Sequence, residues 1–280
     1  MTIKDLLVHV DGSPSAKARL EAAMTLAETF GAHLSVLCLV AEPFIPAIVG
    51  VHIPPDLLQS QLEAAEREAD ALLAVMQETA SRRGLAIDVR RETGSLERLP
   101  AMLARQARHV DLVIVGQPDA ERDGVDDALL AEAAFMESGR PALVIPYIGA
   151  RVVPPKRVLL GWDGSREAAR AANDALPLLK QASSVVVLVV DPAANAAKLG
   201  EQPGADIAAH LARHGARVEV KQVASGGIGV GDVILSQASD EGADLLVIGG
   251  YGHSRLREMV LGGVTRHLLA HMTCPVLLAH

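Results

Sequence analysis

The chain has 280 residues, of which 50% are hydrophobic and 2% aromatic, and it carries a formal net charge of −8. A composition this rich in aliphatic residues excludes an intrinsically disordered chain, and the length predicts two domains or one large one. Proteins that bind single-stranded nucleic acid usually combine aromatic platforms with a positive groove, so we expect no nucleic-acid partner.

In chain order, the first half alternates short apolar runs with longer segments of helical period. Its start contains the charged residues Lys4 and Asp5 and has no uninterrupted apolar run, so it does not resemble a signal peptide. The most apolar window, 34–53, is interrupted by Glu42 and two prolines and makes a poor membrane span. We therefore expect a cytoplasmic protein without membrane contact. Strands are predicted near 5–10, 33–40, 86–91, 111–116 and 142–146, and helices near 14–31, 56–83, 95–108 and 126–138.

The second half repeats the first. Residues 6–13 recur as 158–165, an offset of 152, and residues 111–116 recur as 244–249, an offset of 133. The offset therefore falls by 19 between the two matches, so the second copy has lost about that many residues in its middle. Gly149, Pro154 and Pro155 mark a linker between the copies. We expect the first domain to span residues 1–149 and the second 150–280.

The strands of both copies are near-continuous runs of Val, Leu and Ile separated by helices, which is typical of parallel strands covered on both faces. The sequence therefore predicts two tandem five-stranded, parallel α/β sandwich domains of Rossmann-like architecture. Ligands of such sheets bind at the carboxyl ends of the strands. In the second copy, strands are predicted near 156–161, 184–190, 217–223, 244–249 and 275–279, and the final helix over about 264–272.

The charge is divided unevenly between the copies. Residues 1–150 carry 22 acidic and 13 basic side chains, a net charge of −9, whereas residues 151–280 carry 12 and 13, a net charge of +1. An anionic ligand is therefore better accommodated by the second copy.

A glycine-rich segment follows the fourth strand of the second copy. Gly249 and Gly252 stand where the strand turns into a loop, and Gly262 and Gly263 precede the final helix. Glycines let backbone N–H groups converge on an anion, and a helix N-terminus adds partial positive charge. This pattern is typical of a polyphosphate cradle. It also fits a glycine-rich surface turn followed by an interface helix.

A second loop, Gly161-Trp162-Asp163-Gly164-Ser165, reaches the same edge of the predicted sheet. A carboxylate at Asp163 can hold a ribose hydroxyl or a magnesium ion on the phosphates. An Asp or Ser at this position also serves as the N-cap of the following helix, and both roles can coexist.

With these residues in view, the chain resembles a tandem universal stress protein over essentially its whole length. The family's nucleotide motif, Gly-x2-Gly-x9-Gly-(Ser/Thr), is matched by Gly249, Gly252 and Gly262, while Gly263 replaces the hydroxyl residue. The loss of one hydrogen bond to phosphate typically costs about 0.5–1.5 kcal/mol, so we expect weakened binding. Thr265 can supply a substitute hydroxyl. The resemblance implies an adenine nucleotide alpha-hydrolase-like fold.

The resemblance also implies ATP or another adenine nucleotide in the second domain, with Mg²⁺ or Mn²⁺. Phosphates would lie on the glycines and Val264, ribose or metal near Asp163, and the adenine edge on the backbone around Val189. The expected binding residues are Gly161, Trp162, Asp163, Val189, Gly249, Gly252, His253, Gly262, Gly263, Val264 and Thr265, with Asp163 as the metal ligand.

The first copy departs further from the motif. Gly116 is followed by Gln117-Pro118-Asp119, and Glu121, Asp123, Asp126 and Asp127 would repel a triphosphate. We therefore expect no nucleotide in the first domain. The resemblance further implies that the domains dock through their last strands, 142–146 and 276–279, so that one chain resembles a family homodimer. Dimerisation of whole chains is a second expectation.

Catalytic motifs are weak. The sequence has no P-loop, and no acid/base pair or nucleophile stands out. His267 and His271 lie four residues apart and could pair on a metal, but no third ligand lies nearby in the sequence, so we expect packing or surface roles.

We therefore expect a stress-response protein that uses ATP as a conformational ligand and is largely non-catalytic. One alternative is a nucleotide-free structural or chaperone-like interaction protein. A third is a slow ATPase that uses Asp163 and a metal.

Overall fold

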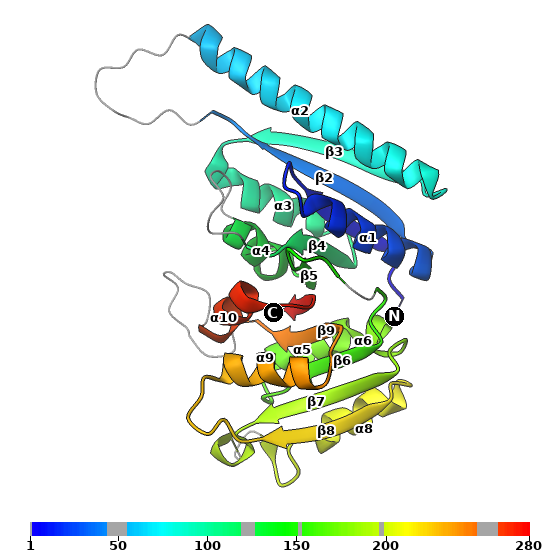
Figure 1. Ribbon diagram of the computed structural model, residues 1–280, viewed down its shortest axis with the longest axis vertical. Helices are drawn as coiled ribbons and strands as arrows, with labels where there is room; N and C mark the ends of the chain where they lie inside the picture. The colour runs from blue at the N-terminus through cyan, green and yellow to red at the C-terminus, as the bar shows by residue number, and fades with distance from the viewer. Residues whose placement is uncertain (1, 44–54, 119–126, 151–152, 196–198, 251–262) are drawn as a thin grey trace, which may run out of the picture.

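The computed structural model describes residues 2–43, 55–118, 127–150, 153–195, 199–250 and 263–280. Within them, ten strands form one continuous sheet in the order β3-β2-β1-β4-β5-β10-β9-β6-β7-β8 (Figure 1). The sequence repeat is therefore visible as two five-stranded halves that join at β5 and β10.

The first copy follows the predicted alternation. Its strands are β1 (Asp5–Val10), β2 (His33–Ala41), β3 (Ile87–Gly94), β4 (Leu112–Gly116) and β5 (Ala142–Ile145). Its helices are α1 (Ala16–Phe30), α2 (Pro55–Arg82), α3 (Leu99–Ala107) and α4 (Asp127–Met136), with a 3-10 turn η1 (Leu96–Arg98).

The second copy has the same order. Its strands are β6 (Arg157–Gly161), β7 (Ser184–Val190), β8 (Val218–Val223), β9 (Leu245–Gly249) and β10 (Val276–Ala279). Its helices are α5 (Arg166–Asp174), α6 (Leu176–Leu179), α8 (Ala205–Arg213), α9 (Val230–Asp240) and α10 (Gly263–His271), with a 3-10 turn η2 (Pro192–Asn195).

All strand pairs within a copy are parallel, and the pair that joins the copies is antiparallel, with Leu277 opposite Leu143. The predicted docking through the last strands is confirmed by this pairing. Two predicted elements needed correction. The strand near 86–91 continues to Gly94, because Ala41 still pairs with it. The helix predicted from residue 95 begins with η1, so the α-helix proper starts at Leu99.

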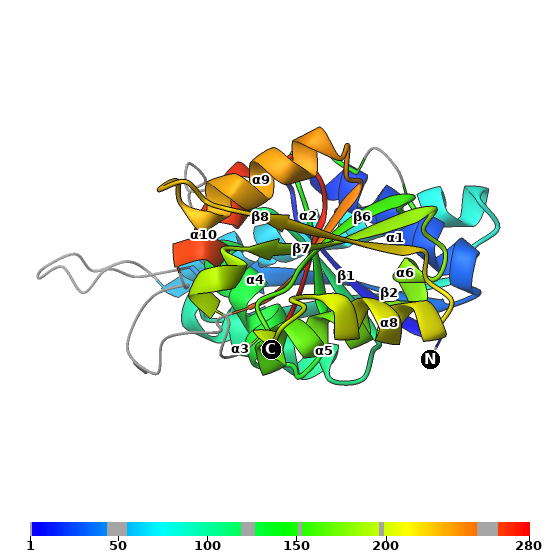
Figure 2. The same cartoon turned by 90° about the horizontal axis from the view of Figure 1, so that it is seen from below.

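Helices cover both faces of the sheet, and Figure 2 shows α9 and α8 on opposite sides of β7 and β8. Because side chains alternate along each strand, Leu6 and Val8 face one core and Leu7 the other. The first core collects α1, α2, α5, α6 and α8, and the second collects α3, α4, α9 and α10. The seam between the two copies is the antiparallel pair β5 and β10. Each core contains residues of both copies, so both cores cross this seam.

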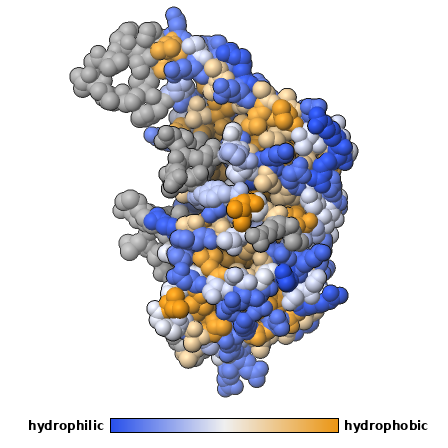
Figure 3. Space-filling view, viewed as in Figure 1, coloured by the Kyte–Doolittle hydropathy of each residue, from blue (hydrophilic) through white to orange (hydrophobic). Residues whose placement is uncertain are grey.

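The 19 residues missing from the second copy correspond to helix length. Helix α2 has 28 residues and its counterpart α8 has 9, a difference of 19. Helix α2 crosses the outer end of the sheet, and Figure 3 shows its outward side as mostly hydrophilic. None of the helices described is both long and apolar enough to cross a membrane.

Candidate functional site

The carboxyl ends of β6 and β9 lie next to each other at the point where the strand order of the second copy reverses. From β6 the sheet continues through β7 on one side and through β9 on the other. Such a reversal opens a crevice where ligands of α/β sheets bind. Asp163 follows β6 and Gly249 ends β9, so the fold brings these two predicted residues to one place. Trp162 joins them to β7, because its backbone N–H donates to the Leu188 carbonyl at 2.8 Å.

Asp163 organises the start of α5. Its Oδ1 accepts hydrogen bonds from the Ser165 backbone N–H at 3.0 Å and from the Ser165 hydroxyl at 2.6 Å. Ser165 is the N-cap residue, and its Oγ accepts from the Ala168 N–H at 3.1 Å. The N-cap role considered for Asp163 therefore belongs to Ser165. Asp163 supports that cap and remains at the mouth of the crevice.

Helix α5 approaches the end of β9 very closely. A Cβ atom on Gly249 would lie 2.4 Å from the Ala168 nitrogen and 2.5 Å from the Glu167 carbonyl carbon. The glycine is thus required by backbone packing, in addition to its predicted role with phosphate. The same approach places the N-terminal turn of α5, with its partial positive charge, at the crevice.

Glu167 is a residue of this region that the sequence did not indicate. It is buried in the first turn of α5, where its carboxylate accepts a hydrogen bond from the Arg166 Nε. Burial raises the pKa of this carboxyl, but the Arg166 hydrogen bond, with smaller contributions from its own backbone N–H and from His280, holds it below its ordinary value. The Glu167 carboxylate is therefore already paired with Arg166.

The end of β7 carries Val189 and Asp191. Val189 is fully buried, backbone included, so its contact with adenine stays a prediction. Asp191 has a left-handed backbone with φ of 49°, and its Oδ1 accepts from the Ser225 N–H at 2.8 Å. Hydrogen bonds from Ser225 hold the pKa of Asp191 below its ordinary value. This contact ties the glycine-rich turn after β8 to the end of β7.

Part of the predicted phosphate site falls on α10. Gly263 and Val264 are exposed at its start, whereas Thr265 is buried. No atom of the described residues lies within 4 Å of a Cβ placed on Gly263, so these residues leave room for a side chain there. Gly252, His253 and Gly262 lie outside the described residues, and their role stays a prediction.

The first copy fills the equivalent crevice with its own cation. The Arg19 guanidinium pairs with Asp11 at 2.8 Å and lies over Gly116, where a Cβ would meet its Nη1 at 2.0 Å. Arg19 is 2% exposed. Burial alone would raise the pKa of Asp11. Arg19, the Ser13 hydroxyl and His9 together lower it by more, so the pKa of this carboxyl stays well below its usual range. Ala171 stands at the Arg19 position in the second copy.

His267 and His271 both contact other residues of the protein. The His267 Nε2 lies 2.7 Å from the Asp232 Oδ1 and so links α10 to α9, and the two imidazole rings are 4.4 Å apart. Nowhere in the described part of the chain do three His, Cys, Asp or Glu residues gather as a metal site.

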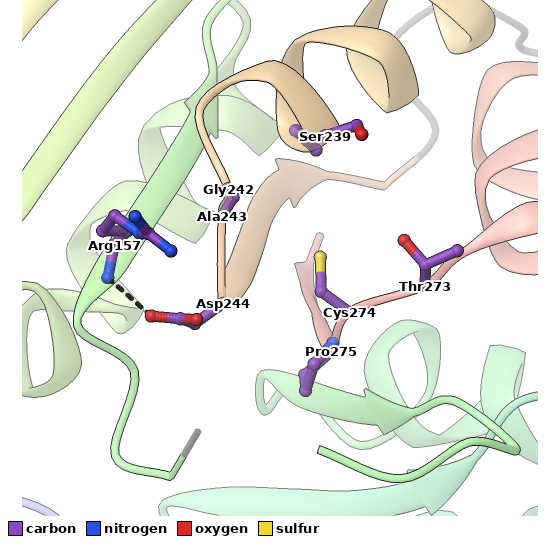
Figure 4. A pocket seen from close by; sticks show the side chains of 9 residues that line it. Arg157, Ser239, Gly242, Ala243, Asp244, Thr273, Cys274 and Pro275 are labelled. Atoms are coloured by element: carbon purple, nitrogen blue, oxygen red, sulfur yellow. Dashed lines mark hydrogen bonds between the residues drawn. The ribbon is translucent and has the colours of Figure 1, made fainter. Parts of the chain in front are cut away.

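A cavity of about 330 Å³ opens at the opposite edge of the sheet, at the amino ends of β6, β9 and β10 (Figure 4). Its Asp244 accepts from the backbone N–H groups of Lys156 and Arg157, and Asp111 makes the same contacts in the first copy. Burial raises the pKa of the Cys274 thiol to about 11, so the thiol is protonated at neutral pH. Because this cavity lies at the amino ends of the strands, it is separate from the site residues predicted at their carboxyl ends. The lining residues are Arg157, Ala238, Ser239, Gly242, Ala243, Asp244, Thr273, Cys274 and Pro275.

Comparison with known proteins agrees with this architecture. The family model described as "Universal stress protein family" matches residues 2–134 and 154–280. Universal stress protein Slr1230 of Synechocystis is 24% identical over 98% of this chain and 99% of its own length. Universal stress protein YxiE of Bacillus subtilis is 44% identical over 45 residues, which cover 16% of this chain and 30% of that protein.

Two solved structures share the fold over nearly the whole chain. A universal stress protein from Archaeoglobus fulgidus superposes with a TM-score of 0.72 at 16% identity and covers 98% of this chain and 97% of its own. A universal stress protein from Pseudomonas aeruginosa superposes with a TM-score of 0.57 at 15% identity, over 99% and 93% of the two chains.

Proposed function

Because the chain belongs to the universal stress protein family, we propose that its second copy binds ATP or another adenine nucleotide in the crevice between β6 and β9. One observation carries this proposal. Asp163, the N-terminal turn of α5 and Gly249 meet at that crevice, whereas the same place in the first copy is filled by Arg19. The two copies thus differ where a ligand would lie.

The ligand would use backbone groups more than side chains. The phosphates would lie beside Gly249 and the exposed start of α10, and adenine would lie beside the backbone at Val189. Asp163 would hold a ribose hydroxyl or a Mg²⁺ or Mn²⁺ ion, since a carboxylate oxygen suits these cations. The phosphates would complete the coordination of such an ion.

In this proposal the protein acts in the cytoplasm as a ligand-regulated component of the stress response. The nucleotide stabilises one state of the second copy and so changes its contacts with partner proteins. Turnover of ATP is slow or absent.

The test begins with protein purified without added nucleotide. We expect ATP or a related nucleotide in the supernatant after denaturation, separated on an anion-exchange column. Added Mg-ATP should raise the melting temperature, because a ligand at 100 times its Kd stabilises the folded state by about 2.7 kcal/mol. Absence of both effects, with either Mg²⁺ or Mn²⁺ present, would refute nucleotide binding.

A pair of matched variants locates the ligand. Gly252→Val should abolish the ATP-dependent shift, because the side chain would obstruct the phosphate path. Gly12→Val lies at the opening turn of the first copy, where a Cβ meets no atom of the described residues within 4 Å. The second variant should keep the full shift. Binding that survives Gly252→Val would place the nucleotide elsewhere.

The alternative of a nucleotide-free interaction protein is favoured by the packing of Gly249 and Gly250. Both glycines are required where a Cβ would meet α5 or Phe135, so neither needs a ligand to explain it. The same ATP titration separates the two functions. The slow ATPase is tested by Asp163→Ala, which should abolish any phosphate release. Release that persists in that variant would come from a contaminant.

A further inference from the structure

The cavity at the amino ends of β6, β9 and β10 is lined by residues that are smaller than their counterparts in the first copy. An offset of 133 relates Gly242 to His109, and an offset of 134 relates Cys274 to Arg140. The second copy therefore has a glycine and a cysteine where the first has two large basic side chains. These replacements leave space in the second copy at the edge of the sheet opposite to the proposed nucleotide crevice.

Arg157 supplies a positive charge to this cavity. An offset of 152 relates it to Asp5, so the sign of the charge at the start of the first strand is reversed between the copies. The guanidinium lies against Gly242, where a Cβ would be 2.8 Å from its Nη2 (Figure 4). Among the described residues, no carboxylate forms an ion pair with it. Its planar donors suit a ligand carboxylate, which arginine binds through two parallel hydrogen bonds.

Asp244 places a negative charge beside Arg157. The two residues are neighbours on β6 and β9, because the Asp244 N–H donates to the Arg157 carbonyl at 2.8 Å. The Asp244 Oδ2 accepts from the backbone N–H groups of Lys156 and Arg157 at 3.1 and 3.0 Å. Its Oδ1 accepts no hydrogen bond from the described residues. One carboxylate oxygen is thus left for a donor on a ligand.

Two helices also end at the cavity. Helix α9 ends at Asp240 and α10 at His271, each two residues before a lining segment, 242–244 and 273–275. The C-terminal end of a helix carries partial negative charge and favours a cation nearby. The cavity therefore offers a positive group at Arg157 and a negative environment at Asp244 and the helix ends.

The remaining lining is apolar and of suitable size. Ala238, Ala243 and Pro275 contribute apolar surface, and the Cys274 thiol is uncharged. The volume is about 330 Å³. A closed apolar cavity of about 150 Å³ holds a benzene molecule. There is thus room for a ring or a branched aliphatic chain together with a charged head group.

We propose that this cavity binds a zwitterionic α-amino acid with an apolar side chain. The ligand carboxylate lies on the Arg157 guanidinium, and the ammonium group lies between the Asp244 Oδ1 and the carbonyls that end α9. A ligand with a single charge meets one of these two groups as a repulsive neighbour. The site is separate from the proposed nucleotide crevice, so it does not depend on that function.

The experiment is a calorimetric titration of the full chain with three probes that share a phenyl ring. They are L-phenylalanine, hydrocinnamate, which lacks the amine, and phenethylamine, which lacks the carboxylate. We expect phenylalanine to bind at least about tenfold more tightly than either analogue, because each analogue loses one contact between charged groups. Equal affinities for the three probes, or no heat from phenylalanine at millimolar concentration, would overturn the proposal.

Two variants with matched controls locate the ligand. Arg157→Gln should weaken phenylalanine binding about tenfold and leave phenethylamine binding no weaker, whereas Lys156→Gln changes an exposed neighbour outside the cavity lining and should bind as the parent does. Asp244→Asn keeps an acceptor for the two backbone N–H groups and should also weaken phenylalanine binding about tenfold. Asp111→Asn makes the same change in the first copy and should have no effect on affinity.

Parental affinity in Arg157→Gln would overturn the proposal, and this exposed position keeps the test valid if Asp244→Asn does not fold. An equal loss in Lys156→Gln would also overturn it. Phenylalanine should bind equally well with and without Mg-ATP. Displacement of phenylalanine by Mg-ATP would place it in the nucleotide crevice and would contradict a separate site.

Discussion

At the scale of single residues, the two copies differ most sharply at Arg19, which corresponds to Ala171. Arg19 and Asp11 form a pair whose side chains are 3% and 16% exposed. Removing one partner of a buried pair leaves a charge without compensation, which typically costs about 3–5 kcal/mol. Removal of Arg19 alone should therefore be costly, and the pair occupies the place that corresponds to the proposed ligand site of the second copy.

We predict that Arg19→Met lowers the free energy of unfolding at pH 7 by about 3 kcal/mol. The pKa of Asp11 is about 4 in the unfolded chain and lower in the folded chain. The stabilisation that comes from ionised Asp11 is therefore complete above about pH 4, and it is lost as the pH falls from there through the folded-state pKa. The difference between variant and parent should therefore shrink toward pH 3. Urea denaturation at both pH values measures it.

Arg83→Met is the control for this prediction. Arg83 also makes two ion pairs, with Glu21 and Glu28, but its side chain is 30% exposed. Ion pairs in contact with solvent contribute about 0–1 kcal/mol. An Arg19→Met variant as mild as Arg83→Met would show that the buried pair does not hold the first copy together.

Gly263 offers a second test at one residue. Gly263→Ser restores the hydroxyl of the family motif, and no atom of the described residues lies within 4 Å of its Cβ. One added hydrogen bond to phosphate should tighten ATP binding about twofold to twelvefold, which corresponds to about 0.5–1.5 kcal/mol. Gly263→Ala adds the same Cβ without the hydroxyl. Calorimetric titration of both variants compares them, and equal affinities would remove this position from the phosphate site.

At the scale of elements, helix α2 has two parts with different surroundings. Its later half buries Ala69, Leu73, Met76 and Ala80, whereas Leu57 near its start is 50% exposed. Most of the packing energy of a helix comes from its buried face. The first two turns of α2 therefore contribute little to the core, and the much shorter α8 is sufficient in the second copy.

Proline substitutions separate the two parts of α2. Gln61→Pro should lower the free energy of unfolding by about 1 kcal/mol or less, because the turns before it can fray without exposing the core. Val75→Pro, also at an exposed position, interrupts the packed half and should cost about 3 kcal/mol. Both are measured by urea denaturation. Similar losses in the two variants would contradict this division.

The elements were largely predictable, and the contacts at their ends were not. Aliphatic runs define the strands because buried parallel strands need such side chains on both faces. The pairing of β5 with β10 was expected from the family resemblance and is confirmed. A buried Arg19 could not be read from α1, because an arginine in an amphipathic helix is usually solvated.

The glycines show a similar limit. Gly249 stood out as part of a phosphate motif, but the sequence could not show that α5 occupies the space beside it or that Phe135 packs beside Gly250. Both contacts join residues far apart in the chain, and Phe135 belongs to the other copy. The spacing of residues in the sequence indicates which of them lie near the carboxyl edge of the sheet. It does not indicate which residues pack against them.

At the scale of the whole molecule, the two cores cross the seam, so the copies should unfold together. Leu20→Ala, in α1 of the first copy, removes fully buried packing and should cost about 2–5 kcal/mol. Trp162, the single tryptophan, belongs to the second copy and contacts the same core. Its fluorescence transition should shift together with the far-ultraviolet circular dichroism. A shift in circular dichroism alone would mean that the copies unfold independently.

The antiparallel seam also has a consequence for synthesis on the ribosome. Strand β5 ends at Ile145, but the strand that pairs with its free edge begins at Val276. At about 5–20 residues per second, the ribosome needs roughly 6–26 seconds to make the intervening chain. During that time the nascent first copy presents an open strand edge to other nascent chains on the same messenger. The shortness of β5, four residues, limits such mispairing until β10 emerges.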